Sequence, residues 1–196
     1  MVHPHASDAA WCNRPRRDVD RSIVTTTKPR VRRTAATKAA PCDMLIALYA
    51  VPAAHGAPEV LDAGLVVRAP LAPEHDLVVD WVRRHFTAGW ASEVRSVIAR
   101  RPCGVVIALD AQHILGFCCH DAVARGFVGP IGVAEDARGR GVGAALLRVS
   151  LERMRVEGYA YAVAGAVGAP QFFAQVARAT PIDGSWPGAY RGLLRS

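Results

Sequence analysis

A glycine-rich turn is the part of this sequence whose residue types point most directly to chemistry. Glycines let the backbone turn tightly and approach a ligand, so that the first N–H groups of a following helix converge on an anion. The turn follows an apolar run, precedes a long helical pattern and carries two arginines, and it is predicted to bind phosphate. It consists of Arg138, Gly139, Arg140, Gly141, Val142, Gly143 and Ala144.

Two common phosphate-binding motifs fit this turn poorly. A P-loop closes with Gly-Lys-Ser/Thr, whereas residues 143–145 read Gly-Ala-Ala. A dinucleotide fingerprint matches formally at Gly139, Gly141 and Ala144, but it requires an acidic residue at the end of the next strand. The next predicted strand, residues 159–165, contains no carboxylate. Too little chain follows the turn for the remaining strands of a dinucleotide-binding fold.

The pattern Arg138-x-x-Gly141-x-Gly143, preceded by Ile131-x-Val133, resembles the acetyl-CoA-binding motif of the GNAT acyltransferase superfamily. The resemblance covers roughly residues 60 to 196. It implies an α/β fold with a mixed, mostly antiparallel sheet flanked by helices, in which a central strand pair splays apart to admit the cofactor. An ordinary glycine-rich turn between a strand and a helix is the structural alternative.

The resemblance implies a function and its cofactor residues. The protein is expected to move an acetyl group from acetyl-CoA, the cosubstrate, to the amine of a small molecule or peptide, by direct attack within a ternary complex. The backbone of Ile131 and Val133 is expected to pair with the pantetheine arm, and residues 138–144 to hold the pyrophosphate. The Val133 N–H is also expected to polarise the thioester carbonyl.

Near the C-terminus the sequence departs from the family pattern. Phe173, expected beside the cofactor, stands where the family commonly has a tyrosine that is thought to protonate the leaving thiolate. A glycine that often ends the same short helix corresponds to Arg178. The missing hydroxyl keeps a second function class open, a CoA-binding module without catalysis.

Acceptor residues are implied only by position, because the family places its two early helices beside the acceptor. Glu93 is the candidate catalytic base and Tyr190 a candidate substitute acid, while Trp90 and Asp121 are candidate substrate contacts. Each has a structural alternative. Trp90 suits a hydrophobic staple, and Glu93 suits a solvated carboxylate in the first turn of a helix, where it complements the helix dipole.

The periodicity of apolar residues predicts the elements that position these groups. Leu77 is expected in the buried stripe of the first helix, Gly89 as the break after it, and Ser92 as the cap of the second. The predicted strands are 44–51, 64–68, 103–109, 114–120, 126–133, 159–165 and a last one at Leu193 and Leu194, and the predicted helices are 73–88, 91–101, 142–158 and a short one opening at Pro170.

Composition and charge divide the chain at residue 43. Of the net charge of +7, residues 1–43 carry nine Arg and Lys against four Asp, with no helical or strand period. This segment is predicted to be a disordered basic extension, and 44–196 a single domain. The near-neutral remainder disfavours the third function class, a nucleic-acid adaptor. No secretory signal or membrane span is recognisable, so a cytoplasmic location is expected; a homodimer is left open.

Five cysteines are present without the spacing of a zinc site. The run from Cys118 to Asp121 invites a metal interpretation, but neighbouring side chains on a strand point to opposite faces and cannot meet at one ion. No metal is therefore expected, and the thiols are predicted to be reduced core residues.

Overall fold

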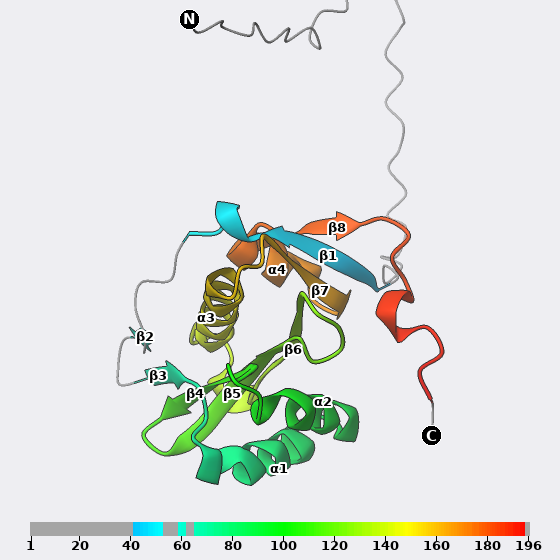
Figure 1. The fold of residues 1–196 in the computed structure, drawn as a ribbon. Coiled ribbons are helices and arrows are strands. Elements are labelled where there is room, and N and C mark those ends of the chain that lie inside the picture. Colours follow the sequence, from blue (N-terminus) through cyan, green and yellow to red (C-terminus); the bar gives the residue numbers. More distant parts are fainter. Residues whose placement is uncertain (1–40, 53–58, 62–64, 195–196) are drawn as a thin grey trace, which may run out of the picture. The chain divides into compact units, whose positions relative to one another are not determined.

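The protein is described by a computed structural model, which places residues 41–52, 59–61 and 65–194. The expected disorder of the N-terminal extension concerns residues that, up to residue 40, lie outside this described part. The ordered elements form one sheet with helices on both of its faces (Figure 1). In sheet order the strands are β2 (Glu59–Leu61), β3 (Leu65–Arg68), β4 (Val105–Asp110), β5 (His113–His120), β6 (Phe127–Val133), β7 (Tyr161–Val167), β1 (Cys42–Ala47) and β8 (Thr180–Ile182).

Neighbouring strands run antiparallel throughout this sheet except for β6 and β7, which are parallel. The β4–β5 hairpin turns at Ala111 and Gln112, as the spacing of its two apolar runs predicts. A mixed, mostly antiparallel sheet is thus confirmed. The single parallel pair results from the crossover through α3 (Val142–Val156), since parallel neighbours need a long connection.

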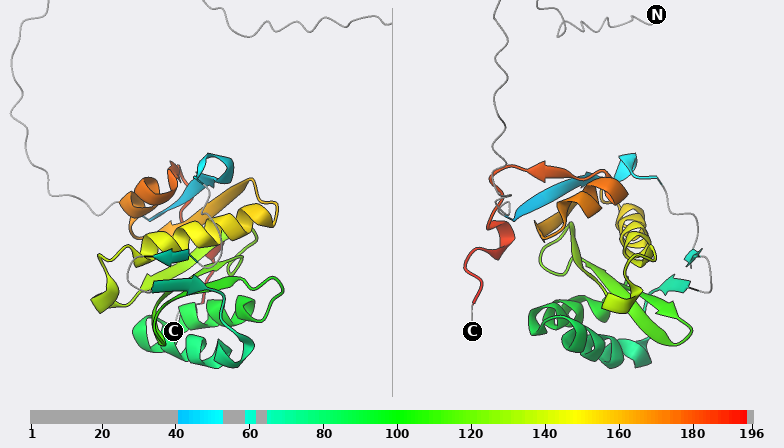
Figure 2. Two further views of the ribbon diagram at one scale, coloured as in Figure 1. Left: turned by 90° about the vertical axis from the view of Figure 1, so that its left-hand side faces the viewer. Right: turned by 180° about the vertical axis from the view of Figure 1, so that it is seen from behind.

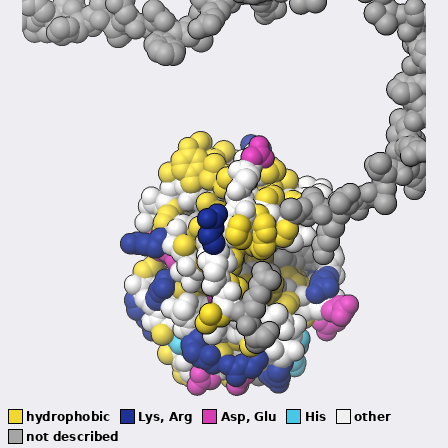
Figure 3. Space-filling view, turned by 90° about the vertical axis from the view of Figure 1, so that its right-hand side faces the viewer, with side chains coloured by type: hydrophobic (Ala, Val, Ile, Leu, Met, Phe, Trp, Pro, Cys, Tyr) yellow, Lys and Arg dark blue, Asp and Glu magenta, His cyan; other side chains and the backbone are white. Residues whose placement is uncertain are grey.

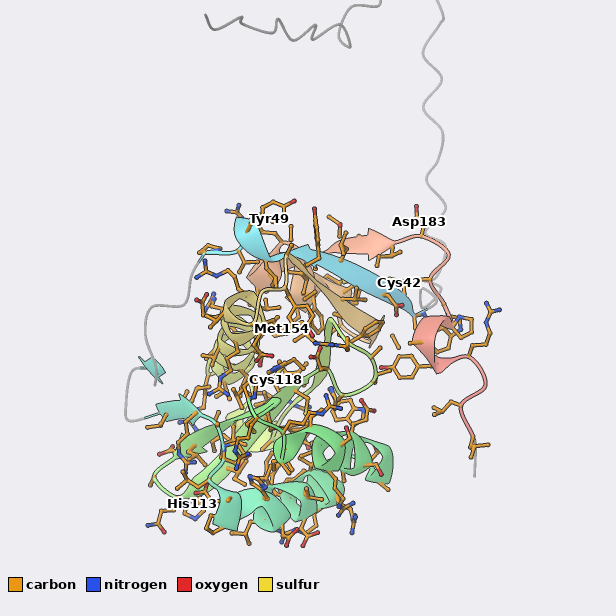
Figure 4. The ribbon with its side chains drawn as sticks, in the orientation of Figure 1. Cys42, Tyr49, His113, Cys118, Met154 and Asp183 are labelled. Carbon is orange, nitrogen blue, oxygen red and sulfur yellow. The ribbon has the colours of Figure 1, made fainter. Side chains whose placement is uncertain are left out.

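Helices α1 (His75–His85) and α2 (Ala88–Ile98) lie on one face of the sheet, while α3 and α4 (Pro170–Ala177) lie on the other (Figure 2). On α3 the predicted stripe Leu147, Leu151 and Met154 is fully buried. Burial of each such side chain contributes on the order of 2 kcal/mol. The interior position of Met154 and Cys118 between α3 and the sheet is visible in Figure 4.

The corner between the two early helices differs from the sequence prediction. Leu77 is 65% exposed, because the buried face of α1 is formed by other residues, among them Val78 and Val82. The cap of α2 is Thr87, whose Oγ1 accepts the Trp90 N–H at 3.1 Å. The predicted cap at Ser92 and break at Gly89 were wrong, since α2 begins at Ala88 and both residues lie inside it.

The first strand occupies an interior position in the sheet. β1 lies between β7 and β8 and runs antiparallel to both, with Leu45 opposite Val163 and Thr180. It begins at Cys42 and gives way at Leu48 to a 3₁₀ turn, so it is shorter than the strand predicted over 44–51. The first described strand in the chain therefore becomes a structural neighbour of the C-terminal region.

The predicted last strand at Leu193 and Leu194 was wrong. These side chains are 68% and 95% exposed, and the last strand is β8 instead. A 3₁₀ turn, Gly188–Tyr190, follows β8. With β1 already paired to β7, the end of the chain has no interior sheet position to fill.

The side chains of Cys118 and Cys119 point to opposite faces of β5, toward Ser150 of α3 and toward Glu93 of α2 respectively. Burial raises the pKa of the Cys118 thiol to about 12, and burial likewise raises that of Cys119. His120 Nε2 lies 3.1 Å from Glu157 Oε1 at the end of α3. Within the described residues, no three His, Cys, Asp or Glu side chains are grouped as metal ligands.

Hydrophobic side chains gather in the upper part and centre of the face drawn in Figure 3, while cations lie mainly along its lower edge and sides. None of the helices that the structure describes has both the length and the apolar character needed to cross a membrane.

Candidate active site

The parallel strand pair separates after two residues. β6 pairs with β7 only at Phe127–Val163 and Val128–Ala164. Gly129 and Pro130 follow on β6, and a proline has no N–H to donate to a ladder. Beyond this point the strands diverge around a cleft of about 770 Å³, a size typical of small-molecule sites. The predicted splayed pair is thus confirmed, and its cause lies in the sequence of β6.

The open edge of β6 presents backbone groups to the cleft. The Ala134 N–H donates to the Leu115 carbonyl of β5 at 2.8 Å. Since successive N–H groups of a strand point to opposite sides, those of Val133 and Ile131 point away from β5 and toward the cleft. The Val133 carbonyl is on the same side and accepts Arg138 Nε at 3.3 Å.

The glycine-rich turn adjoins one end of this edge. Gly139 and Gly141 have φ values of +78° and +79°, a conformation that residues with a Cβ rarely adopt. Gly141 caps α3, whose first hydrogen bond runs from the Ala145 N–H to the Gly141 carbonyl at 3.1 Å. The N–H groups of Val142, Gly143 and Ala144 precede this bond. They are free for an anion and lie at the positive end of the helix dipole.

The two arginines of the turn have different surroundings. Arg138 lines the cleft, whereas Arg140 Nη2 lies 3.2 Å from Asp110 Oδ2 at the end of β4. Both members of the Arg140–Asp110 pair are about half exposed, so solvent screens their attraction. Arg138 is the arginine that faces a ligand in the cleft.

Glu93, Trp90 and Tyr190 also line the cleft. Tyr190 lies against Gly165 beside Phe127, at the start of β6, and the charge of Glu93 acts on it, whereas Gly143 lies beside Val133 at the end of β6. Burial raises the pKa of the Glu93 carboxyl. Burial also raises the pKa of Tyr190 to about 12, with smaller contributions from the charges of Glu93 and Asp43. Tyr190 therefore keeps its proton at neutral pH, and Glu93 is a stronger base than an exposed glutamate. A carboxylate that can accept a proton and a phenol that can donate one thus line the same cavity.

Asp43 forms hydrogen bonds that connect β1 to β7 and to the segment that leads to Tyr190. Its side chain is 6% exposed, and its Oδ1 accepts the Ala166 N–H of β7 at 2.8 Å. The Asp43 N–H donates to Ser185 Oγ at 2.7 Å, which joins β1 to the segment that leads to Tyr190. These bonds hold the segment after β8 against the sheet.

Phe173 lines the cleft and is 7% exposed, with its ring centroid 5.1 Å from that of Phe172. The resemblance predicts that Phe173 lies beside the cofactor, and in the structure it lines the cleft. Arg178, at the end of the same helix, has φ +53°, which is the conformation that a glycine would adopt without strain.

Asp121 was predicted as a substrate contact, and its position argues against that role. It is not among the residues that line the cleft. Its carboxylate accepts the Gly126 N–H and the Tyr159 hydroxyl, each at 2.7 Å. Both oxygens are engaged in holding the turn between β5 and β6, so Asp121 acts in the structure as a turn-stabilising residue.

Sequence reasoning missed several aromatic residues of the cleft, namely Phe86, Phe127 and Phe172. Phe86 ends α1, and Phe127 begins β6. Neither position belongs to a motif. The proximity of Phe172 to Phe173 was the only available signal, since both lie on the short helix that the resemblance already placed at the cofactor.

Comparison with known families gives a match to the acetyltransferase (GNAT) family over residues 75–175, about half of the chain. No curated protein sequence matches the chain. Solved structures share the fold at low sequence identity. A GCN5-related N-acetyltransferase from Sphaerobacter thermophilus is 22% identical, with a TM-score of 0.55 over 74% of this chain and 50% of its own.

The glucosamine N-acetyltransferase region of a fungal multi-domain β-N-acetylglucosaminidase is 13% identical, with a TM-score of 0.57 over 74% of this chain and 20% of that protein. A Drosophila protein is 13% identical, with a TM-score of 0.54 over 72% of this chain and 47% of its own. The chain thus spans half or less of the length of these proteins. The family match and the splayed sheet together show that the chain belongs to the GNAT acetyltransferase family.

Proposed function

We propose that the protein is an N-acetyltransferase that uses acetyl-CoA and acts by direct attack of an amine on the thioester in a ternary complex. The observation that carries the proposal is the continuity of the cleft. It leads from the free N–H groups at the start of α3, along the open edge of β6, to Glu93 and Tyr190.

The residues of the cleft fit the successive parts of acetyl-CoA. The N–H groups of Val142, Gly143 and Ala144 suit the pyrophosphate, with Arg138 adding positive charge. The open edge at Val133 suits the amides of the pantetheine arm. Ile131 lies farther from the cradle, so its N–H suits the thioester carbonyl, and we assign the oxyanion role to Ile131 rather than to Val133.

Glu93 and Tyr190 supply the proton transfers. Glu93 accepts a proton from the acceptor ammonium, and the neutral nitrogen then attacks the thioester carbon. Collapse of the tetrahedral intermediate breaks the C–S bond, and the nitrogen loses its second proton as the amide forms; this proton restores the one that Tyr190 gives up, and Glu93 then releases its own proton to solvent. Tyr190, whose raised pKa keeps it protonated, donates to the departing sulfur. Tyr190 thus takes the role of the family's tyrosine acid, which Phe173 cannot fill because it lacks the hydroxyl.

A non-catalytic CoA-binding module is the second candidate, and Phe173 favours it. If Tyr190 is the acid, Phe173→Tyr should change neither CoA affinity nor turnover appreciably, while Tyr190→Phe lowers kcat. A large gain of rate from Phe173→Tyr would show that the wild type lacks a working acid.

The proposal is tested by measuring free thiol released from acetyl-CoA with a panel of amines, next to thermal shifts with CoA. We expect stabilisation by CoA and amine-dependent thiol release. Stabilisation without any amine-dependent release would contradict the acetyltransferase and support the binding module. Absence of both effects would contradict the proposed cofactor site.

A further inference from the structure

The acceptor end of the cleft carries a preference for one class of amine. We infer that the acceptor is a small amine with a single positive charge and an apolar, preferably aromatic, body. This inference rests on the proposed acetyl transfer, and it names the substrate class of that same site.

Polar groups are scarce in the cleft. Of the described residues that line it, only Glu93, Arg138 and Tyr190 have polar side chains, apart from the indole N–H of Trp90, which can donate but cannot accept a bond from an ammonium. Arg138 lies at the phosphate end, where it bonds to the Val133 carbonyl. The acceptor end therefore offers one carboxylate and one hydroxyl, which is enough for one ammonium group.

One wall of the acceptor end is aromatic and held in place. The Phe86 and Trp90 ring centroids are 5.2 Å apart, and each ring packs on the fully buried Phe117, at 5.6 and 6.0 Å. Rings fixed in this way form an apolar surface that is ordered before any ligand binds. Such a surface binds apolar bodies at little cost in side-chain entropy.

Phe127 and Tyr190 also line the cleft, and both lie against Gly165 of β7. Gly165 makes room for both, since a Cβ there would lie 2.9 Å from Phe127 Cε1 and 3.2 Å from Tyr190 Cε2. Glu93 thus shares its cavity with four aromatic rings, those of Phe86, Trp90, Phe127 and Tyr190. Aromatic rings near an ammonium attract it through their faces.

The same composition disfavours other acceptors. A second ammonium would find no second carboxylate among the described side chains that line the cleft, which lowers affinity by about 10- to 100-fold. An acceptor carboxylate would be repelled by the charge of Glu93. Polyamines and free amino acids are thus expected to be poor substrates.

Two matched pairs of amines test whether the acceptor must carry a single positive charge. The assays use the full chain and saturating acetyl-CoA. 2-Phenylethylamine and phenylalanine differ by one carboxylate, and butylamine and 1,4-diaminobutane differ by one ammonium. We expect kcat/KM to be at least about 10-fold higher for the singly charged member of each pair. Equal values, or a preference for the diamine or the amino acid, would overturn the inference while leaving acetyl transfer intact.

Variants test the aromatic wall. Trp90→Ala should lower kcat/KM for 2-phenylethylamine several-fold more than for butylamine. Trp186→Ala is the matched control, because this tryptophan is 45% exposed and does not line the cleft. Equal losses for both amines in Trp90→Ala would contradict the aromatic preference.

A binding measurement decides the question if no amine turns over. Tryptophan fluorescence of the CoA-bound protein is titrated with 2-phenylethylamine and with phenylalanine. Selective saturable binding of the amine supports the inference even though the transfer reaction would then have failed. Equal binding, or none, overturns it.

Discussion

The cofactor end and the acceptor end of the cleft are built in different ways. The proposed cofactor end comes from one continuous stretch, β6, the glycine turn and the start of α3, and it presents backbone N–H groups. The acceptor end gathers side chains from α2, from β6 and from the 3₁₀ turn near the C-terminus. Local construction leaves a motif in the sequence, whereas assembly across the sheet leaves none.

The two ends also differ in electrostatics. The cofactor end is open to solvent and attracts an anion with peptide dipoles and an arginine. The acceptor end is half-buried, and burial raises the pKa values of both Glu93 and Tyr190. Binding of the cofactor and proton transfer to and from the acceptor are therefore separable by mutation.

The largest effect is expected at the cradle. Gly141→Asp places a carboxylate and a side chain where backbone meets phosphate, and should abolish thermal stabilisation by CoA. Gly158→Asp is the matched control, since Gly158 also has a positive φ and open surroundings but lies at the other end of α3. Both variants should lose basal stability. Retention of the CoA shift by Gly141→Asp would refute the cradle.

Next in size is the loss of the base. Glu93→Gln should lower kcat/KM by about 100- to 10,000-fold while leaving CoA affinity unchanged. The pH profile of the wild type should rise through the pKa of Glu93, because only the ionised form accepts a proton, and this limb should be absent in the variant. An unaltered profile would return Glu93 to a structural role, and the acceptor end would then need another base.

The N-terminal strand offers a test of intermediate size. Asp43→Ala removes the acceptor of the Ala166 N–H and should destabilise the fold by about 1–3 kcal/mol. Deletion of residues 1–40 retains Asp43 and β1, and should leave thermal stability and CoA binding unchanged. Deletion up to Met44 also removes Cys42 and Asp43 and should resemble Asp43→Ala. Loss of stability in the shorter deletion would show that the extension is part of the folded unit.

The smallest effects concern stability against pH, where two glutamates should differ in sign. Burial raises the folded-state pKa of Glu93, so its contribution is present at low pH and is lost as pH rises through that pKa. Glu93→Gln should therefore be more stable than the wild type at neutral pH, and the gain should shrink on acidification toward pH 4.5, the ordinary value.

Glu74 is the matched control. Its two hydrogen bonds with Arg68, each 2.7 Å, hold the pKa of the carboxyl at about 2, so its contribution is present above pH 4.5 and is lost as pH falls toward 2. Glu74→Gln should accordingly destabilise the protein at neutral pH. The same sign for both variants, in melting temperatures across pH, would contradict the burial of Glu93.

The sequence allowed much of the fold to be predicted because its signals are local. The stripe of α3, the β4–β5 hairpin and the interrupted β6 follow from periodicity and from Gly129 and Pro130. The placement of β1 could not be predicted, since nothing in 42–47 specifies β7 and β8 as its partners. Leu193 and Leu194 were misread for the same reason, because an apolar pair does not show whether a sheet position remains open for it.

The candidate site likewise has a part that local sequence signals reveal and a part that they do not. The glycines of the turn are recognisable in the sequence because glycine is the residue type that adopts a positive φ without strain, as Gly139 and Gly141 do. Phe86 and Phe127 acquire their place in the cleft only when α1 and β7 pack around β6. The carboxylate of Asp121 is engaged by the Gly126 N–H and the Tyr159 hydroxyl, which the sequence could not show, because a carboxylate engaged in a turn and one free for a substrate look alike in sequence.

The central claim is that one cleft brings the thioester to Glu93 and Tyr190. A crystal structure of the protein with CoA tests it most directly. The pyrophosphate is expected on the N–H groups of Val142, Gly143 and Ala144, the arm along Val133, and the sulfur between Ile131 and Tyr190. A cofactor bound elsewhere, or one whose sulfur points away from Glu93, would contradict the proposed active site.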